Sequence, residues 1–234
     1  MDTKVSKFAT MKIRSYYPAR NLAFPLLFSL SALLFLLFLP SRVQAQQQRF
    51  KAGIIAGVTA SQIDGDQSAG YHKLGLQGGL RGVTILGPKQ EASIEILYSQ
   101  RGSRNQPKTY PEFSTTLGFV EVPVQWHYND WLVEGEDNEP DWYRVQFNVG
   151  LSYSRLLSTS DKYNDGYGIY AALPHLNKNS YCFLIGGSFY ATRHVGFSFR
   201  YHRAINKLYK IGGGGNFRSD LIEHYLAFQV VYMF

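Results

Sequence analysis

Two side chains with the chemistry of nucleophilic catalysis lie close together in the sequence, Ser198 and His202. A serine nucleophile needs a histidine base within hydrogen-bond reach and a third group that orients that base. Ser198 and His202 share one face of an extended segment, and four positions along a strand span about 13 Å. They therefore do not touch each other, and His127 is the alternative base that we consider for Ser198.

A second pair of candidate groups is Glu95 and Glu121, which have the chemistry of a general acid and a general base. Nothing in the sequence places a substrate between them. Residues 212–215 are four glycines, but no Lys-Ser or Lys-Thr follows them, so this run is not a phosphate-binding loop. We expect no enzyme active site, no metal and no cofactor. The histidines that lack the spacing of metal ligands are His72, His175, His194 and His224.

The first 45 residues have the order of a secretory signal peptide. Basic residues precede an apolar run at 22–39, Pro40 ends that run, and Val43-Gln44-Ala45 places small residues at the −3 and −1 positions of a cleavage site. We expect cleavage after Ala45, which divides the chain into a signal peptide (1–45) and a barrel domain (46–234). The rival interpretation is an uncleaved anchor, because this run approaches the roughly 20 residues that span a bilayer.

The positive charge of the chain belongs mostly to this leader. The whole chain carries +7, and removing residues 1–45 leaves 18 basic and 16 acidic residues, a net charge of +2. This balance does not favour nucleic acid as a partner. Cys182 is the only cysteine, so an exported form of the chain has no internal disulfide and depends on its packing or on a membrane.

The mature chain alternates apolar and polar residues with a period of two. Residues 195–201 place Val, Phe, Phe and Tyr on one face and Gly, Ser and Arg on the other. A helix does not sort residues in this way. The segments with this pattern, clear or weaker, are 50–61, 73–84, 91–101, 120–128, 144–154, 181–190, 195–201 and 225–234.

The apolar faces carry large aromatic and branched residues, and the opposite faces carry Gly, Ser, Asn, Gln and charges. In a transmembrane barrel the apolar face contacts lipid and the polar face lines the interior. The sheet must close, because each unpaired amide in a bilayer costs several kcal/mol. We predict an all-β fold, an eight-stranded antiparallel up-and-down transmembrane β-barrel. The alternative, a soluble β-sandwich or lipocalin-like barrel, would expose Phe197, Phe199 and Phe228 or bury Arg200 and Glu121.

The connections between these segments alternate in length. Outer-membrane barrels have short periplasmic turns and longer outer loops. The spacers 62–72, 102–117, 156–180 and 204–223 are long, and 85–90 and 191–194 are short. The exception is 129–142, an acidic stretch that we keep as a candidate periplasmic docking segment.

Ten polar or charged residues share the inward face of the predicted strands. Side chains fill the interior of an eight-stranded barrel, so we interpret these residues as an ion-paired plug. The alternative is a narrow polar pore or a small-ligand pocket. The ten residues are Lys51, Arg81, Glu95, Arg101, Glu121, Gln125, His127, Gln146, Arg200 and His202.

The last segment resembles the C-terminal insertion signal of outer-membrane β-barrel proteins, which implies the barrel assembly machinery as a partner. Its alternating residues are Leu226, Phe228, Val230, Tyr232 and Phe234.

The mature chain also resembles the PorT-like outer-membrane barrel family of Bacteroidetes. The matching stretches, in family order, are Lys51-Ala52-Gly53, GVTASQIDGD at 57–66, EILYSQRGS at 95–103, FVEVP at 119–123, and Gly150 followed by Leu156-Leu157. Most members of this family have no assigned activity, and PorT itself is linked to gliding and type IX secretion. The resemblance therefore implies an outer-membrane location and partners among secretion-system or envelope proteins.

Three functional hypotheses follow. The first is a non-enzymatic structural or interaction barrel that contacts outer-membrane lipid and serves a secretion or gliding machinery. The second is a narrow pore or small-ligand-binding barrel. The third is a lipid-modifying barrel enzyme that uses Ser198 with His127 or His202.

Overall fold

The computed structural model describes residues 49–66, 68, 70–105, 112–135, 140–162, 169–210 and 220–234, without the side chains of 170 and 171. The predicted signal peptide, the glycine run at 212–215 and the middle of the acidic stretch lie outside these residues. Within the described part of the chain, no helix is long and apolar enough to cross a membrane.

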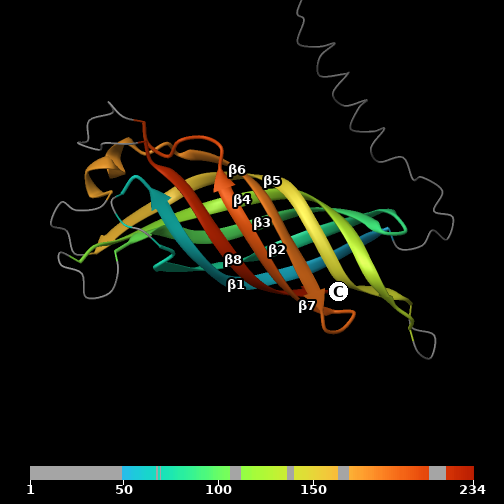
Figure 1. Cartoon of the computed structure of the whole chain (residues 1–234). Helices are drawn as coiled ribbons and strands as arrows, with labels where there is room; N and C mark the ends of the chain where they lie inside the picture. Colours follow the sequence, from blue (N-terminus) through green and yellow to red (C-terminus); the bar gives the residue numbers. More distant parts are fainter. Residues whose placement is uncertain are drawn as a thin grey trace, which may run out of the picture. The chain divides into compact units, whose positions relative to one another are not determined.

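Eight strands form one closed ring (Figure 1). Each strand pairs antiparallel with the next, and β8 pairs with β1, so neither edge of the sheet is left open. The predicted eight-stranded antiparallel barrel is therefore confirmed. The strands are β1 (Phe50–Asp64), β2 (Lys73–Gly87), β3 (Gln90–Arg104), β4 (Ser114–Val133), β5 (Trp142–Lys162), β6 (Asn179–Tyr190), β7 (Val195–Ala204) and β8 (Ile222–Met233).

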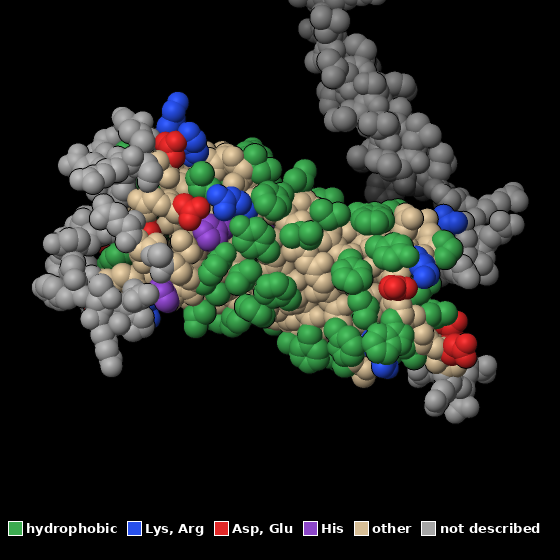
Figure 2. Space-filling model, in the orientation of Figure 1, with side chains coloured by type: hydrophobic (Ala, Val, Ile, Leu, Met, Phe, Trp, Pro, Cys, Tyr) green, Lys and Arg blue, Asp and Glu red, His purple; other side chains and the backbone are tan. Residues whose placement is uncertain are grey.

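The wall of the barrel is apolar on the outside and polar on the inside. On β8, Phe228 and Val230 are 47 % and 46 % exposed, while the intervening Gln229 is buried. The same alternation runs along all eight strands. Figure 2 shows apolar side chains gathered over the middle of the visible wall, with charged side chains nearer its two ends. We call this outward apolar band the belt.

The two ends of the barrel differ, and we name them the turn end and the loop end. The turn end holds the β2–β3, β4–β5 and β6–β7 connections and the C terminus (Figure 1). The loop end holds the β1–β2, β3–β4, β5–β6 and β7–β8 connections, and the β5–β6 connection contains a short 3₁₀ helix, η1 (Tyr170–His175).

All eight strands are longer than the segments that the sequence pattern indicated, and β4 and β5 exceed them the most. β4 and β5 have 20 and 21 residues, and their register continues to the pairs Val133↔Trp142 at one end and Ser114↔Lys162 at the other. The spacer predicted at 129–142 is thereby reduced to residues 134–141. At the loop end the outermost residues of both strands lie past the belt, where outward positions are polar and the alternation that marks a strand disappears.

Apolar residues close the loop end. Ile63, Leu117 and Phe119 point inward from β1 and β4 and pack against residues of the long loops. We call this group the loop-end cap. Its described loop members are Ile169, Ala172, Leu176, Leu208, Tyr209 and Leu221.

A carboxylate is also buried in the β1–β2 loop at this end. Asp66 is 2 % exposed and accepts hydrogen bonds from the Ser103 hydroxyl and the Ser68 backbone amide. Burial raises the pKa of the Asp66 carboxyl, and these two hydrogen bonds act in the opposite direction.

The belt predicts a position-dependent cost for a charge on one strand. Leu151 and Leu157 both point outward from β5 and are 62 % and 60 % exposed, but Leu157 lies past Arg155 toward the loop end. In lipid, Leu151→Arg is expected to lower the free energy of unfolding by about 2 kcal/mol, and Leu157→Arg by less than about 1 kcal/mol. Urea titration of the barrel folded into vesicles measures both values, and a loss below about 1 kcal/mol for both variants would show that the belt does not face lipid.

Candidate functional site in the barrel interior

The structure places nine of the ten predicted interior residues inside the barrel, each no more than 4 % exposed. Lys51 lies at the turn end instead, where its side chain is 41 % exposed. The nine buried residues are Arg81, Glu95, Arg101, Glu121, Gln125, His127, Gln146, Arg200 and His202.

Arg101 is the centre of a polar network on the loop-end side of the interior. Its guanidinium donates to Glu121, to Glu223 at 3.1 Å and to Ser154 at 3.1 Å, and its Nε donates to Ser99 at 3.1 Å. The guanidinium carbon also lies 4.1 Å from the ring centroid of Tyr225. A buried charge is tolerated when counter-charges and hydrogen bonds satisfy it, and all three nitrogens of Arg101 are satisfied.

Glu121 links this network to a histidine. The Tyr225 hydroxyl donates to Glu121 Oε1 at 2.7 Å and lies 2.7 Å from His202 Nδ1. His202 stacks on the Tyr225 ring with centroids 4.3 Å apart. Sequence reasoning missed Glu223 and Tyr225, although both share the inward face of β8 with Gln229, so the period-two pattern held the signal.

A second network lies on the turn-end side of the interior. Arg200 donates two hydrogen bonds to the two carboxylate oxygens of Glu95, at 2.7 and 2.9 Å. Arg81 Nε lies 3.6 Å from the same carboxylate, and its terminal nitrogens reach Gln146 at 3.1 Å and the Tyr190 hydroxyl at 3.4 Å. Two cations therefore share one acid at this level of the barrel.

A glycine makes room for Arg200. Gly186 points inward from β6 opposite Arg200, and a Cβ built there would lie 2.3 Å from the Phe199 carbonyl oxygen and 2.9 Å from Arg200 Cγ. Any side chain at this position would displace the arginine stem that reaches Glu95.

Neutral amide side chains fill the remaining space between the charges. Asn148 donates to Gln125 Oε1 at 2.6 Å, and Gln229 donates to Gln77 Oε1 at 2.7 Å. The interior is therefore a set of side chains bonded to one another across the lumen.

The candidate catalytic residues do not form a triad. Ser198 accepts a hydrogen bond from Ser188 at 3.0 Å, and His127 Nε2 lies 2.7 Å from the Ser93 hydroxyl. His127 Nδ1 has no hydrogen-bond partner among the described residues, so no described acid orients that ring. Glu95 and Glu121 are each held by an arginine. Among the described residues, no group of three or more potential ligands could hold a metal ion.

The comparisons with known proteins concern the fold. A family model described as an outer membrane protein beta-barrel domain matches residues 44–210. A search of curated proteins finds no match.

Solved structures that resemble the chain are distant in sequence. The attachment invasion locus protein Ail of Yersinia pestis, in complex with the heparin analogue sucrose octasulfate, is 10% identical, with 80% of this chain and 100% of that chain covered and a TM-score of 0.41. Neisserial surface protein A is 12% identical, with 79% and 97% covered and a TM-score of 0.38. OprG of Pseudomonas aeruginosa is 11% identical, with 79% and 94% covered and a TM-score of 0.36.

The buried Arg200–Glu95 pair predicts a large loss of stability when its cation alone is removed. Arg200→Met leaves Glu95 with Arg81 as its only cation, and the expected loss is about 3 kcal/mol of unfolding free energy. Arg200→Lys keeps the charge but not the two-pronged geometry, so its loss is expected to be smaller.

The matched control is Lys89→Met, which removes a cation from the exposed Lys89–Asp130 pair at the turn end. Because solvent screens that pair, its removal is expected to change stability little. Urea titration in vesicles measures the free energy of unfolding of the three variants. A loss for Arg200→Met no greater than that for Lys89→Met would show that the Arg200–Glu95 pair does not stabilise the barrel.

Proposed function

The chain belongs to the family of outer membrane protein β-barrel domains, and from this premise we propose that it is a non-enzymatic barrel with a closed lumen whose role is structural or interactive. It contacts outer-membrane lipid through its belt. Partners bind the surfaces at its ends, and solutes do not pass through its centre.

One observation carries this proposal: side-chain bonds cross the lumen between opposite strands. In a ring of eight, strands four places apart face each other. Arg200 of β7 bonds to Glu95 of β3, and Tyr225 of β8 bonds to Glu121 of β4. The Arg81–Tyr190 bond joins β2 to β6 in the same way. An eight-stranded interior is about wide enough for such side chains and little else.

The loop-end cap supports the same conclusion. Apolar loop residues pack on Ile63, Leu117 and Phe119 across the end of the barrel, beyond the polar networks. A conducting path would have to pass both layers. The narrow-pore alternative therefore requires the ion pairs and the cap to rearrange together.

The cap also gives the described parts of the β5–β6 and β7–β8 loops a defined position. The Leu208 carbonyl accepts a backbone hydrogen bond from Asn177 and its amide donates one to Leu221, so the β5–β6 and β7–β8 loops are joined to each other. A fixed loop surface suits recognition of another protein, because less ordering cost is incurred on binding.

The finer part of the proposal is that this surface serves a secretion or gliding machinery. Its support is the resemblance to PorT-like barrels. We also infer that the chain is not a lipid-modifying enzyme, because Ser198 and His127 are each bonded to a different serine inside the barrel.

The closed lumen is tested by conductance in planar bilayers. The wild-type barrel is expected to give no stepwise conductance above that of the bare membrane, because the two polar networks block ion passage. Insertion is verified in the same preparation by a gel-mobility shift between heated and unheated samples. Regular conductance steps from the inserted wild-type barrel would overturn the proposal in favour of a pore.

The cellular role is tested by deleting the gene and complementing it. Loss of the chain is expected to impair secretion or gliding while leaving uptake of small solutes unchanged. Complementation with a Ser198→Ala or His127→Ala variant is expected to restore the phenotype, as the wild type does. A defect in solute uptake would indicate a pore, and failure of both variants to complement despite normal folding would indicate an enzyme.

A further inference from the structure

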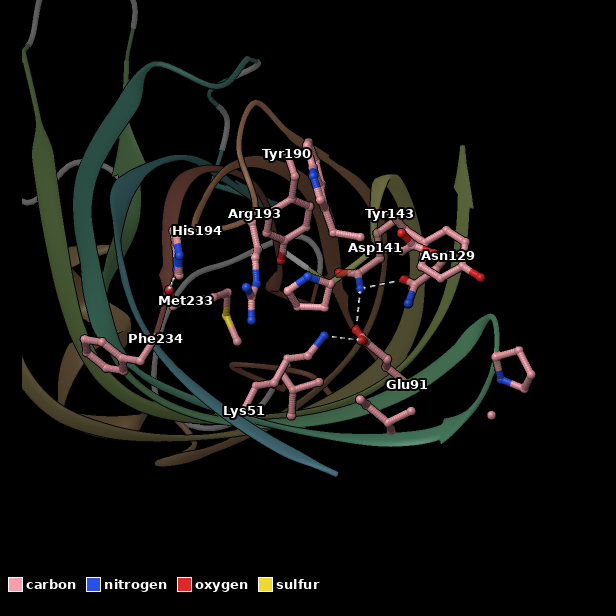
Figure 3. A pocket seen from close by; sticks show the side chains of 17 residues that line it. Lys51, Glu91, Asn129, Asp141, Tyr143, Tyr190, Arg193, His194, Met233 and Phe234 are labelled. Atoms are coloured by element: carbon pink, nitrogen blue, oxygen red, sulfur yellow. Dashed lines mark hydrogen bonds and ion pairs between the residues drawn. The ribbon is translucent and has the colours of Figure 1, made fainter. Parts of the chain in front are cut away.

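A cavity of about 440 Å³ opens at the turn end of the barrel (Figure 3). This volume lies within the range of sites that bind small organic molecules. The cavity lies on the turn-end side of the Arg81 network and shares Gln146 and Tyr190 with that network.

One wall of the cavity is apolar. Val83, Tyr190 and Met233 line it from β2, β6 and β8, and they belong to a buried apolar cluster against which Trp142 packs. Here, as in the loop-end cap, inward positions are apolar, in contrast to the polar networks that lie between the two ends. This wall suits the apolar body of a ligand.

The acids that line the cavity already have partners. Glu91 accepts from Lys51 Nζ at 3.1 Å through one oxygen and from Gln146 Nε2 at 3.0 Å through the other. Asp141 accepts from the Gly135 backbone amide at 3.1 Å. Both acidic side chains therefore accept hydrogen bonds, and one of them, Glu91, is paired with a cation.

Arg193 is a cation without such a partner. Among the described residues it has no hydrogen bond or ion pair, and its side chain extends over the cavity toward Lys51 in Figure 3. Lys51 has one acidic partner for its three N–H groups. Two cationic side chains from β1 and the β6–β7 turn thus converge on the cavity.

The turn that carries Arg193 is held in place. Ala191 and Thr192 donate backbone hydrogen bonds to the Val195 carbonyl, and His194 Nδ1 lies 2.8 Å from the Met233 carbonyl oxygen. Met233 in turn donates its backbone amide to His194. The base of the arginine side chain is therefore fixed relative to the apolar wall.

We infer that this cavity binds a small organic anion, a carboxylate or a phosphate attached to a compact apolar body. Arg193 and Lys51 contact the anionic group, and the apolar wall that includes Val83 and Met233 packs against the body. The planar guanidinium of arginine pairs with either oxyanion through two parallel hydrogen bonds. The inference goes beyond the proposed function and does not depend on whether the lumen conducts.

The test uses calorimetric titration of the full barrel in lipid nanodiscs with benzoate and phenyl phosphate. Benzamide, which has the shape of benzoate without its charge, and benzylammonium, which has the opposite charge, are the matched ligands. Empty nanodiscs correct for partitioning into lipid. Benzoate or phenyl phosphate is expected to bind at least tenfold more tightly than benzamide, and benzylammonium is expected to bind weakest. The tighter of the two anions identifies the natural ligand as a carboxylate or a phosphate.

Two variants assign the binding to this cavity. Arg193→Gln removes the charge and keeps at most one of the two hydrogen bonds, so it is expected to weaken anion binding about tenfold. Arg104→Gln, the same change at an exposed arginine near the loop end, is expected to leave binding unchanged. Val83→Phe fills the cavity and is expected to abolish binding of benzoate and benzamide alike.

Folding of each variant is checked by the heat-dependent gel shift. Because Arg193 lies in an exposed turn, the Arg193→Gln variant is expected to fold, and it still tests the inference if Val83→Phe does not fold. The inference is overturned if neither anion binds above empty nanodiscs, if benzylammonium binds as well as benzoate, or if Arg193→Gln binds as tightly as the wild type.

Discussion

The structure depends on the requirement that every charge enclosed by a closed ring of eight strands meets a counter-charge within that ring. Arg101, Arg200 and Arg81 enter the lumen from β3, β7 and β2, and each reaches an acid or polar group on a distant strand. A cation left alone there would cost several kcal/mol. The partners must therefore meet across the lumen, and in meeting they occupy it. The stability of the wall and the closure of the centre have the same cause.

The same requirement explains the arrangement of the wall. Period-two alternation that directs polar groups inward must direct the intervening residues outward, and these are apolar because lipid is their environment. The strands with the clearest alternation, β5, β7 and β8, were predicted from the sequence for this reason. The ends of β4 and β5 were not, because outward residues such as Ser158 and Ser160 lie past the belt and no longer contrast with their inward neighbours.

The interior could be predicted by face but not by partner. Strand alternation assigns Glu95, Glu121 and Arg200 to the inside, whereas their pairing depends on how far each strand is shifted against the next. That shift is a property of the whole ring and no local pattern records it. His127 consequently lies beside Ser93 and not beside Ser198. The loop-end cap was missed for a related reason, since Ile169, Leu208 and Leu221 lie in connections without a regular period.

The two ends of the lumen differ in chemistry, and each suits a different kind of ligand, a protein at one end and a small molecule at the other. At the loop end, apolar residues from the described parts of the loops pack on the wall, and a partner meets this packed surface. At the turn end, the turns are short, and only the β4–β5 connection contributes cavity-lining residues from a longer segment. Short turns cannot fold back over the barrel, so the cavity lined by Val83, Met233 and Arg193 stays open at this end. Because short turns of outer-membrane barrels face the periplasm, a small anion would reach this cavity from the periplasmic side, while a protein partner of the loops would approach from outside the cell.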